Sequence, residues 1–469
     1  MPSKGESTAP DAIGGRQLNV LTRVGRNFGW LAGSTGFSAI ASLVYVALTA
    51  RALGPRGFGS FALVMTYGEL VTNLAQFQSW KAVVGFGAAH QQANSRTRLG
   101  RLFGYTASLD LLSGIVGSAA AILGIVLIGP LLHWIASEES AAAWFGTVSL
   151  LTSGTTAGGI LRLFNRFDLQ VYSESLAQIV RLVGCLVGWA IGASVGWFLA
   201  VWALAALVLF VSQWAAVFAR GHRISLGRRA FRLTGHENRG LWSFMLKTNV
   251  SSSLSLFWMQ CGTLVVGVRA GPIEAGGFRL AHRFSLAMMK PVEIAAKALF
   301  PELARLVADG DHGAVRRVLK GVSFLSAVFA SLMVVLAALF GRQVLYLVAG
   351  PAFEFAHQFL FLLCIAAAIN VAGFVLEPFL NGHFRPGIVL RSYGVAALLY
   401  GSVLIVLLPS VGSAAAAFAS IAAAAVLMLQ LGVASLGILR GPDNRHQDAT
   451  GRRARAETEV AVSKSAVQT

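Results

Sequence analysis

Five ionisable side chains share one face of a single apolar stretch, residues 277–300. They are Arg279, Arg283, Lys290, Glu293 and Lys297. At 3.6 residues per turn, these positions fall within a stripe of roughly 80° on a helix. An ionisable group near the middle of a bilayer costs about 2.5–3.5 kcal/mol, so such a stripe has to face protein or water. Because arginine grips phosphate oxygens in a fork and lysine acts as a point charge, the stripe is suited to hold an anion.

Other apolar stretches also contain ionisable residues. Arg181 and Lys247 are further candidates for the same cationic surface. The acids inside apolar stretches are Glu69, Asp110, Glu293 and Glu377. These acids could take part in coupling, or they could form structural ion pairs with the same cations. Arg279 and Lys297 lie near the ends of their stretch and could instead reach the membrane interface.

The composition is that of a membrane protein. The 469 residues are 55% hydrophobic and only 12% charged, whereas soluble domains carry about 25% charged residues. Runs long enough to cross a bilayer contain about 20 residues each. We expect twelve such spans, at 28–50, 60–89, 102–132, 141–161, 172–192, 195–219, 241–268, 277–300, 321–340, 355–378, 386–409 and 411–438. The sequence therefore predicts an all-α polytopic membrane protein with about 12 transmembrane helices.

The basic residues are distributed unevenly between the loops. If the amino end is cytoplasmic, the inner segments carry 27 Lys or Arg and the outer segments only 4. This asymmetry follows the positive-inside rule with both termini in the cytoplasm. The net charge of +18 thus records topology, and we expect no nucleic-acid partner. We expect residues 1–27 to form a cytoplasmic tail without a cleavable signal peptide. We expect residues 439–469 to form a basic, disordered cytoplasmic tail.

A glycine–proline motif occurs twice, in the same register. Its copies are Gly54, Pro55 and Gly59, and, at a constant offset of 217, Gly271, Pro272 and Gly276. Each copy is typical of a turn between helices, where glycine supplies unusual backbone angles and proline blocks helix continuation. The offset predicts two parallel six-helix repeats, 28–219 and 241–438, joined by a basic cytoplasmic linker at 220–240. Such repeats in transporters place the substrate site between them.

The cysteines indicate no metal or redox site. Cys185, Cys261 and Cys364 all lie inside apolar stretches and lack metal-ligand spacing, so each is interpreted as a small apolar residue. We expect no metal site, no cofactor and no catalytic residue.

Four stretches, in order along the chain, resemble the Wzx-type polysaccharide and oligosaccharide flippases. The stretches are 51-RALGPRGFGSFAL-63, 157-AGGILRLFNRFDLQVY-172, 263-TLVVGVRAGPIEAGGFRLAHRFSL-286 with 299-LFPELARL-306, and 347-LVAGPAFEFAHQFLFLL-363. These flippases belong to the multidrug/oligosaccharidyl-lipid/polysaccharide exporter superfamily, which also contains the MATE exporters and the lipid II flippase. The resemblance covers nearly all of residues 28–438.

The resemblance implies a MATE-like fold, with two bundles facing each other across a central cavity that opens alternately to either side. It further implies that the cargo is an oligosaccharide on a polyprenyl pyrophosphate. The cargo would be flipped from the inner to the outer leaflet of the bacterial cytoplasmic membrane during exopolysaccharide biosynthesis. The implied partners are the lipid-linked oligosaccharide, membrane lipids, a polysaccharide polymerase and glycosyltransferases.

Two other functions remain open at this point. A MATE-like antiporter of cationic drugs or metabolites needs an acid in the amino-terminal half; residues 28–50 have none, but Glu69 and Asp110 keep this function possible. A membrane polysaccharide polymerase, ligase or glycosyltransferase tends to carry catalytic groups on large outer loops. The longest outer loop, about 341–354, has only Arg342 and Glu354 as charges. A transporter without covalent chemistry is therefore the leading hypothesis.

Overall fold

The computed structural model describes residues 11–132, 134–308, 312–382 and 386–440, which are helical and contain no strand. The amino-terminal elements are α1 (Asp11–Ala75), α2 (Ser79–Gln92), α3 (Arg96–Ile128), α4 (Ala136–Thr152), α5 (Thr156–Leu163), α6 (Phe167–Ala190), α7 (Val195–Ala219) and α8 (Arg228–Glu237). The remaining elements are α9 (Leu241–Ala308), α10 (His312–Ala349), the 3₁₀ helix η1 (Pro351–Ala356), α11 (His357–Ala372), α12 (Leu376–Gly382), α13 (Pro386–Val411), η2 (Gly412–Ala414) and α14 (Ala415–Arg440).

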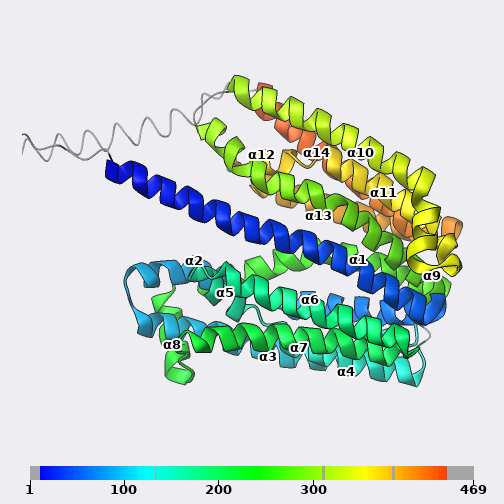
Figure 1. Cartoon of the computed structure of the whole chain (residues 1–469), viewed down its shortest axis with the longest axis horizontal. Coiled ribbons are helices and arrows are strands. Elements are labelled where there is room, and N and C mark those ends of the chain that lie inside the picture. Colours follow the sequence, from blue (N-terminus) through cyan, green and yellow to red (C-terminus); the bar gives the residue numbers. More distant parts are fainter. Residues whose placement is uncertain (1–10, 133, 309–311, 383–385, 441–469) are drawn as a thin grey trace, which may run out of the picture.

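Most of the helices run along the long axis of the molecule and form two lobes (Figure 1). One lobe contains α2 to α7, and the other contains α10 to α14 with the second part of α9. The amino-terminal part of α1 runs between the two lobes. The lobes come together at the right-hand end of Figure 1, where α1 and α9 change direction.

Six stretches of the described residues are long and apolar enough to cross a membrane by length and composition. They are Arg96–Ile128, Phe167–Ala190, Val195–Ala219, Gly321–Ala349, Pro351–Ala372 and Gly387–Gly437. Many large apolar side chains on these helices are exposed, including Leu123, Val126 and Leu398, as a lipid-facing surface requires. The all-α membrane fold expected from the sequence is confirmed, whereas the number of twelve spans stays a prediction.

Several helix boundaries differ from the expected spans. The span expected at 60–89 is interrupted after α1 ends at Ala75, the span at 141–161 is interrupted after Thr152, and the span at 355–378 is interrupted after Ala372. The first helix begins at Asp11 instead of residue 28, so the described part of the amino-terminal tail is helical. The tail predicted at 439–469 lies almost entirely outside the described residues.

Asp110 on α3 explains two of these interruptions. Its buried carboxylate accepts hydrogen bonds from the Thr156 backbone N–H at 3.0 Å, from the Thr156 hydroxyl at 2.7 Å and from the Ser79 hydroxyl. Ser79 and Thr156 are the first residues of α2 and α5. The carboxylate thus satisfies a backbone N–H at the start of α5 and the hydroxyl of the first residue of α2, and its charge compensates the partial positive charge at both helix N-termini.

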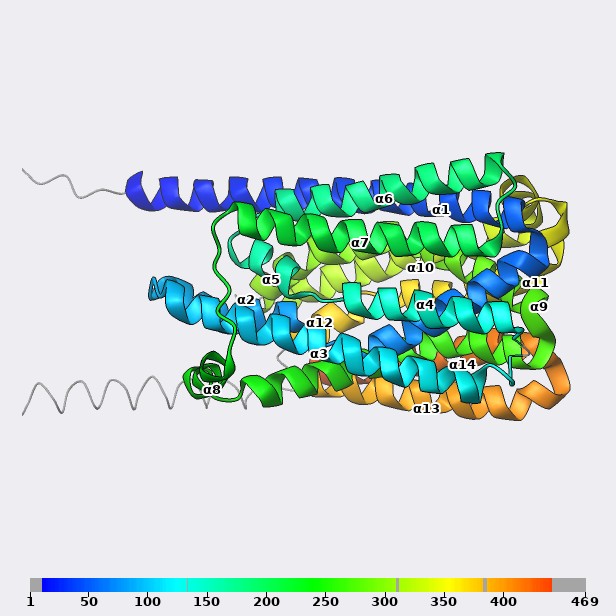
Figure 2. The same ribbon diagram turned by 90° about the horizontal axis from the view of Figure 1, so that it is seen from below.

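Both copies of the glycine–proline motif produce a sharp kink inside a long helix. Gly54 has φ 64° and ψ 179°, and Gly271 has φ 82° and ψ −177°. A positive φ with an extended ψ is accessible in practice only to glycine. Pro55 and Pro272 then start the next helical segment, where the missing N–H of proline costs nothing. The chain reverses direction at each kink (Figure 2).

The two motifs also pack directly against each other. A Cβ added to Gly59 would lie 1.8 Å from the carbonyl oxygen of Pro272, and a Cβ added to Gly276 would lie 2.9 Å from the Gly59 Cα and 3.3 Å from the Pro55 oxygen. Equivalent positions therefore make equivalent contacts across this junction. The division into two parallel repeats, 28–219 and 241–438, stays a prediction, and this reciprocity supports it.

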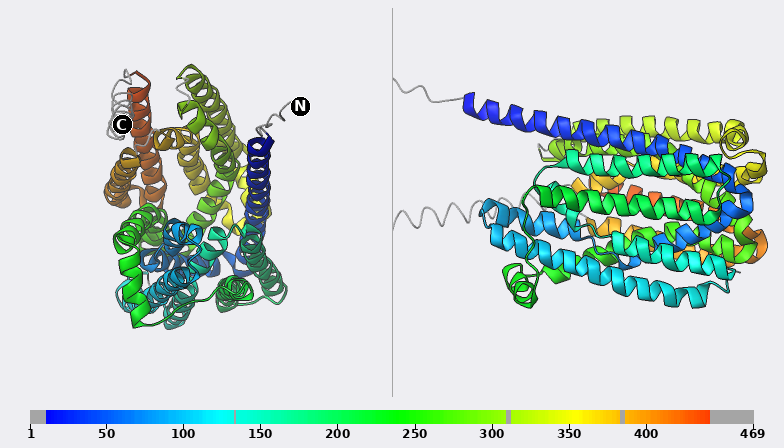
Figure 3. Two further views of the ribbon diagram at one scale, coloured as in Figure 1. Left: turned by 90° about the vertical axis from the view of Figure 1, so that its left-hand side faces the viewer. Right: turned by 60° about the horizontal axis from the view of Figure 1, so that its bottom comes forward.

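The described ends of the chain lie at the opposite end of the molecule from the kinks. The start of α1 and the end of α14 both lie toward the left-hand side of Figure 1, and the views in Figure 3 agree. The linker predicted at 220–240 lies at the same end and contains α8. An ion pair between Arg101 and Glu237 and a 2.9 Å contact between His90 and Asn238 fasten the linker to α2 and α3.

We expect both termini to be cytoplasmic. A reporter enzyme that works only in the cytoplasm, fused to the carboxyl end, should be active in cells, because the basic loops lie on the same side as the termini. The same fusion with a reporter that works only outside the membrane should be inactive. The reverse pattern would show that the predicted topology is wrong.

We also expect Gly59→Leu to destabilise the folded protein. A side chain at this position collides with the Pro272 backbone, and overpacking a close contact costs about 1–3 kcal/mol or more. The melting temperature of the purified protein, followed by tryptophan fluorescence, should fall by several degrees. Gly401→Leu is the matched control, because no atom of a packed neighbour lies within 4 Å of a Cβ added there. Equal melting temperatures for both variants would contradict the close contact.

Candidate functional site

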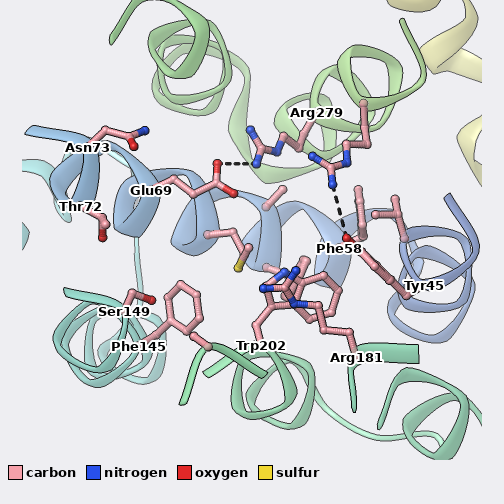
Figure 4. A pocket seen from close by; sticks show the side chains of 16 residues that line it. Tyr45, Phe58, Glu69, Thr72, Asn73, Phe145, Ser149, Arg181, Trp202 and Arg279 are labelled. Atoms are coloured by element: carbon pink, nitrogen blue, oxygen red, sulfur yellow. Dashed lines mark hydrogen bonds and ion pairs between the residues drawn. The ribbon is translucent and has the colours of Figure 1, made fainter. Parts of the chain in front are cut away.

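A cavity of about 260 Å³ lies among α1, α4, α6, α7 and the second part of α9. Its charged lining residues are Glu69, Arg181, Arg279 and Arg283. Its aromatic lining residues are Tyr45, Phe58, Phe61, Phe145 and Trp202. Its uncharged polar lining residues are Thr72, Asn73 and Ser149. Both parts of α1, together with α4, α6, α7 and the second part of α9, supply these side chains (Figure 4).

An ion pair connects α1 and α9 at this cavity. Arg279 on α9 donates a 2.6 Å hydrogen bond to the carboxylate of Glu69 on α1 and a 3.0 Å hydrogen bond to the side-chain oxygen of Gln260. The Arg279 side chain is only 15% exposed, whereas that of Glu69 is 34% exposed. The carboxylate therefore still borders the open space of the cavity while it neutralises one guanidinium.

Arg283 lies one helical turn beyond Arg279 on α9. Its guanidinium donates a 3.4 Å hydrogen bond to the hydroxyl of Tyr45 on the first part of α1. The Tyr45 ring meets the Trp202 ring edge to face, with 5.1 Å between the ring centroids. This aromatic contact fixes the tyrosine hydroxyl, which in turn orients Arg283 without neutralising it.

Arg181 on α6 supplies a third guanidinium on the opposite wall. Its guanidinium carbon lies 5.9 Å from the centroid of the Trp202 ring, within the range of a cation–π contact. Its Nε is buried and has no hydrogen-bond partner. A buried donor without a partner is costly, so this group is positioned to donate to a ligand.

The structure brings together four of the residues predicted from the sequence and separates the others. Arg181, Arg279, Arg283 and Glu69 line the cavity, whereas Lys290 and Lys247 are not among its lining residues. Lys290 is half-buried on α9, two turns beyond Arg283, and Lys247 is exposed near the start of α9. The reason is geometric, because the cavity borders only part of the length of α9.

Of the predicted acids, too, some lie away from the cavity. Asp110 caps α2 and α5, as described above, and the carboxylate of Glu377 accepts a 3.0 Å hydrogen bond from the hydroxyl of Tyr393. Neither acid is among the residues that line the cavity. The side chains of Glu293 and Lys297 lie outside the described residues, so their predicted roles stay untested.

Several lining residues carried no signal in the sequence. Tyr45 and Trp202 are two of many aromatic residues in apolar stretches, and nothing in their spacing distinguishes them. Thr72 and Asn73 are different, because they follow Glu69 at three and four positions and so share its helix face. That spacing could have identified them once Glu69 was recognised as a cavity residue.

The charges of the site favour an anionic ligand. Three guanidinium groups and one carboxylate line the cavity, so the lining carries two surplus positive charges. Aromatic walls lower the local dielectric constant, which strengthens the attraction between these charges and an anion. In the described part of the chain, no group of three or more His, Cys, Asp or Glu residues could hold a metal ion.

Comparison with known proteins agrees with this architecture. The chain is 29% identical over 342 residues to Inner membrane protein YghQ of Escherichia coli (strain K12), covering 71% of this chain and 94% of that protein. It also has the fold of a multidrug resistance MATE family transporter of the MOP superfamily in an inward-facing conformation, with a TM-score of 0.68 and 15% identity over 85% of this chain and 93% of that one. The lipid II flippase MurJ, in an inward closed conformation, has the same TM-score of 0.68, with 13% identity over 86% of each chain.

The sequence model of a family described as Polysaccharide biosynthesis protein matches residues 24–307, more than half of the chain. This match includes both glycine–proline motifs and every residue that lines the cavity. It confirms the family resemblance seen in the sequence, and the chain belongs to the polysaccharide biosynthesis protein family.

Proposed function

We propose that this protein flips a polyprenyl-pyrophosphate-linked oligosaccharide from the inner to the outer leaflet of the bacterial cytoplasmic membrane. The observation that carries this proposal is the surplus of guanidinium groups in the cavity. A pyrophosphate is the most highly charged part of such a cargo, and it has no other means of crossing the hydrocarbon core. Family membership in polysaccharide biosynthesis supports the choice of a saccharide cargo.

The three arginines have different roles in this mechanism. Arg283 and Arg181 contact Tyr45 and Trp202, so they hold their charge against neutral partners. They can therefore bind pyrophosphate oxygens through charge-assisted hydrogen bonds. Arg279 is already paired with Glu69, and this pair keeps the total positive charge low enough for the cargo to leave after it has crossed.

The cavity size fits one part of the cargo. Its volume of about 260 Å³ is just below the range of about 300–1,000 Å³ that is typical of ligand pockets. It can take the pyrophosphate and the groups next to it, but not a whole lipid-linked oligosaccharide. The lobes must therefore separate further during transport, as alternating access between two repeats requires.

The same charges disfavour the antiporter of cationic drugs. A cationic cargo needs an available carboxylate, and the carboxylate in the cavity lining, Glu69, is bound to Arg279 at 2.6 Å. The surplus positive charge would repel such a cargo. We also propose that a polysaccharide polymerase and glycosyltransferases are partners of this protein, because they act before and after it in the proposed pathway.

We expect Arg283→Gln to weaken binding of undecaprenyl pyrophosphate. The substitution removes a charged donor but keeps a polar side chain that can still reach Tyr45. Loss of a charged hydrogen bond is worth about 1.5–3 kcal/mol, which corresponds to a roughly 10- to 150-fold rise in Kd. Binding should be measured with the purified protein in lipid nanodiscs.

Arg342→Gln is the control for this measurement. Arg342 is an arginine outside the cavity, 70% exposed and paired with Glu354, and exposed ion pairs contribute little. Its Kd should stay within about twofold of the wild-type value. An unchanged Kd in Arg283→Gln, or absence of binding to the wild-type protein, would overturn the proposed function.

We expect the Glu69–Arg279 pair to be structural as well as functional. Arg279→Gln leaves the Glu69 carboxylate without its partner at membrane depth. This should cost about 3 kcal/mol of folding free energy. The value is at the lower end for buried pairs because Glu69 is partly exposed. The melting temperature should therefore fall by several degrees. The double variant Glu69→Gln with Arg279→Gln should regain most of this loss, because it leaves no unpaired charge. A double variant as unstable as Arg279→Gln would contradict the assigned pair.

A further inference from the structure

We propose that Thr72, Asn73, Ser149 and Phe145 form a subsite for the first sugar of the cargo, next to the guanidinium groups. This inference rests on the proposed function, since it assigns the part of the cavity that the pyrophosphate does not occupy. It names a binding site for a neutral, hydroxyl-rich ring. It also assigns to these residues the choice between cargoes that differ in that sugar.

The cavity has two chemically different ends. Thr72, Asn73, Ser149 and Phe145 lie at one end in Figure 4, and Arg279 and Tyr45 lie at the other. Glu69 lies between the two ends. A ligand that spans the cavity therefore meets cationic groups at one end and uncharged polar groups at the other. A sugar joined to a pyrophosphate has the same order of charge and neutral hydroxyl groups.

Two helices present the uncharged end. Thr72 and Asn73 lie in the last turn of α1, one turn beyond Glu69, and Phe145 and Ser149 lie one turn apart on α4. Gly68 allows the two helices to approach, because a Cβ added there would lie 3.0 Å from the Phe145 ring. The ring is thereby held against α1 beside Thr72. These positions place an aromatic face and three uncharged polar side chains around one space.

The side chains match the hydrogen-bonding needs of a sugar. Hydroxyl and amide groups both donate and accept, as sugar hydroxyls do. An aromatic ring can pack against the apolar face of a sugar ring, as it does in other largely apolar ligand sites. The hydroxyl oxygen of Thr72 is buried and has no hydrogen-bond partner. Buried polar atoms in native proteins nearly always have a partner, so this hydroxyl is a group that a ligand would satisfy.

The lining itself argues against a lipid tail at this end. A polyprenyl chain offers no hydrogen bonds, so its presence would leave the Thr72 hydroxyl unsatisfied. A second phosphate is also disfavoured, because the acid of the cavity, Glu69, shares a helix face with Thr72 and Asn73 and would repel it. A neutral sugar is the part of the cargo that avoids both penalties.

The test compares four probes on the full-length protein in lipid nanodiscs. The probes are undecaprenyl pyrophosphate alone and the same lipid carrying one glucose, one galactose or one N-acetylglucosamine. The wild-type protein should bind at least one sugar-bearing probe roughly tenfold more tightly than the sugarless lipid, since each neutral hydrogen bond contributes up to about a tenfold gain. Thr72→Val with Ser149→Ala should remove this gain and leave the sugarless Kd unchanged.

Two controls separate the subsite from general damage. Thr66→Val makes the same change on α1 at a residue that is buried away from the cavity and bonded to the Ala62 carbonyl, so it should keep the full sugar-dependent gain. The single variant Thr72→Val keeps the side-chain shape and removes an oxygen that has no partner, so it should fold even if the double variant does not. In Thr72→Val, the logarithm of the ratio between the sugarless and the sugar-bearing Kd should fall to about half of its wild-type value.

The outcomes distinguish the two proposals. Equal wild-type affinity for all four probes, or a full gain in both Thr72→Val and the double variant, would overturn the subsite. If Arg283→Gln still binds the sugarless lipid more weakly than the wild-type protein does in that case, the proposed flippase function stands without the subsite. If the wild-type protein binds none of the four probes, the proposed function fails and the subsite fails with it.

Discussion

The architecture depends on one close contact between two glycines. Gly59 and Gly276 allow the kinked segments of α1 and α9 to touch through their backbones, since any side chain there would meet the facing chain. In a membrane, where apolar surfaces gain little from leaving lipid, such close van der Waals packing is a main source of helix association. The contact fixes the register of the two helices. That register places Glu69 opposite Arg279, 210 residues away in the sequence.

The charged groups of the cavity are held by partners of different kinds. Glu69 neutralises Arg279, whereas Tyr45 and Trp202 contact Arg283 and Arg181 without cancelling their charge. A guanidinium has five N–H donors, so one hydrogen bond to a tyrosine does not exhaust its capacity. The site is therefore stable enough to exist without cargo and still able to bind an anion. A cavity with three arginines and no acid would be more costly to fold.

The sequence revealed the fold class and the ionisable residues, but not which of them meet. Apolar composition predicts a membrane protein, and the high cost of a charge in lipid makes Arg279, Arg283 and Arg181 conspicuous. Which cations share a cavity depends on contacts between distant helices, so Lys290 fits the same helical stripe and still lies outside the lining. The interruption after Ala75 was equally hidden, because the connecting residues 76–78 contain neither glycine nor proline. The glycine–proline repeat, by contrast, was visible because backbone angles restrict residue type directly.

The interruptions explain how polar groups are held at one end of the cavity. Thr72 and Asn73 lie just before α1 ends, where the backbone of Gln76 accepts a 2.7 Å hydrogen bond from the Asn249 side chain, and the Gln76 side chain donates to the Ser153 carbonyl. Nearby, Asp110 accepts hydrogen bonds from Ser79 and Thr156 at the starts of α2 and α5, and Gly154 permits its approach, since a Cβ there would lie 3.2 Å from that carboxylate. Broken helices are tolerated at membrane depth only when protein groups satisfy their free ends. Asp110 therefore stabilises the helix starts that follow the breaks after Ala75 and Thr152, although it does not line the cavity itself.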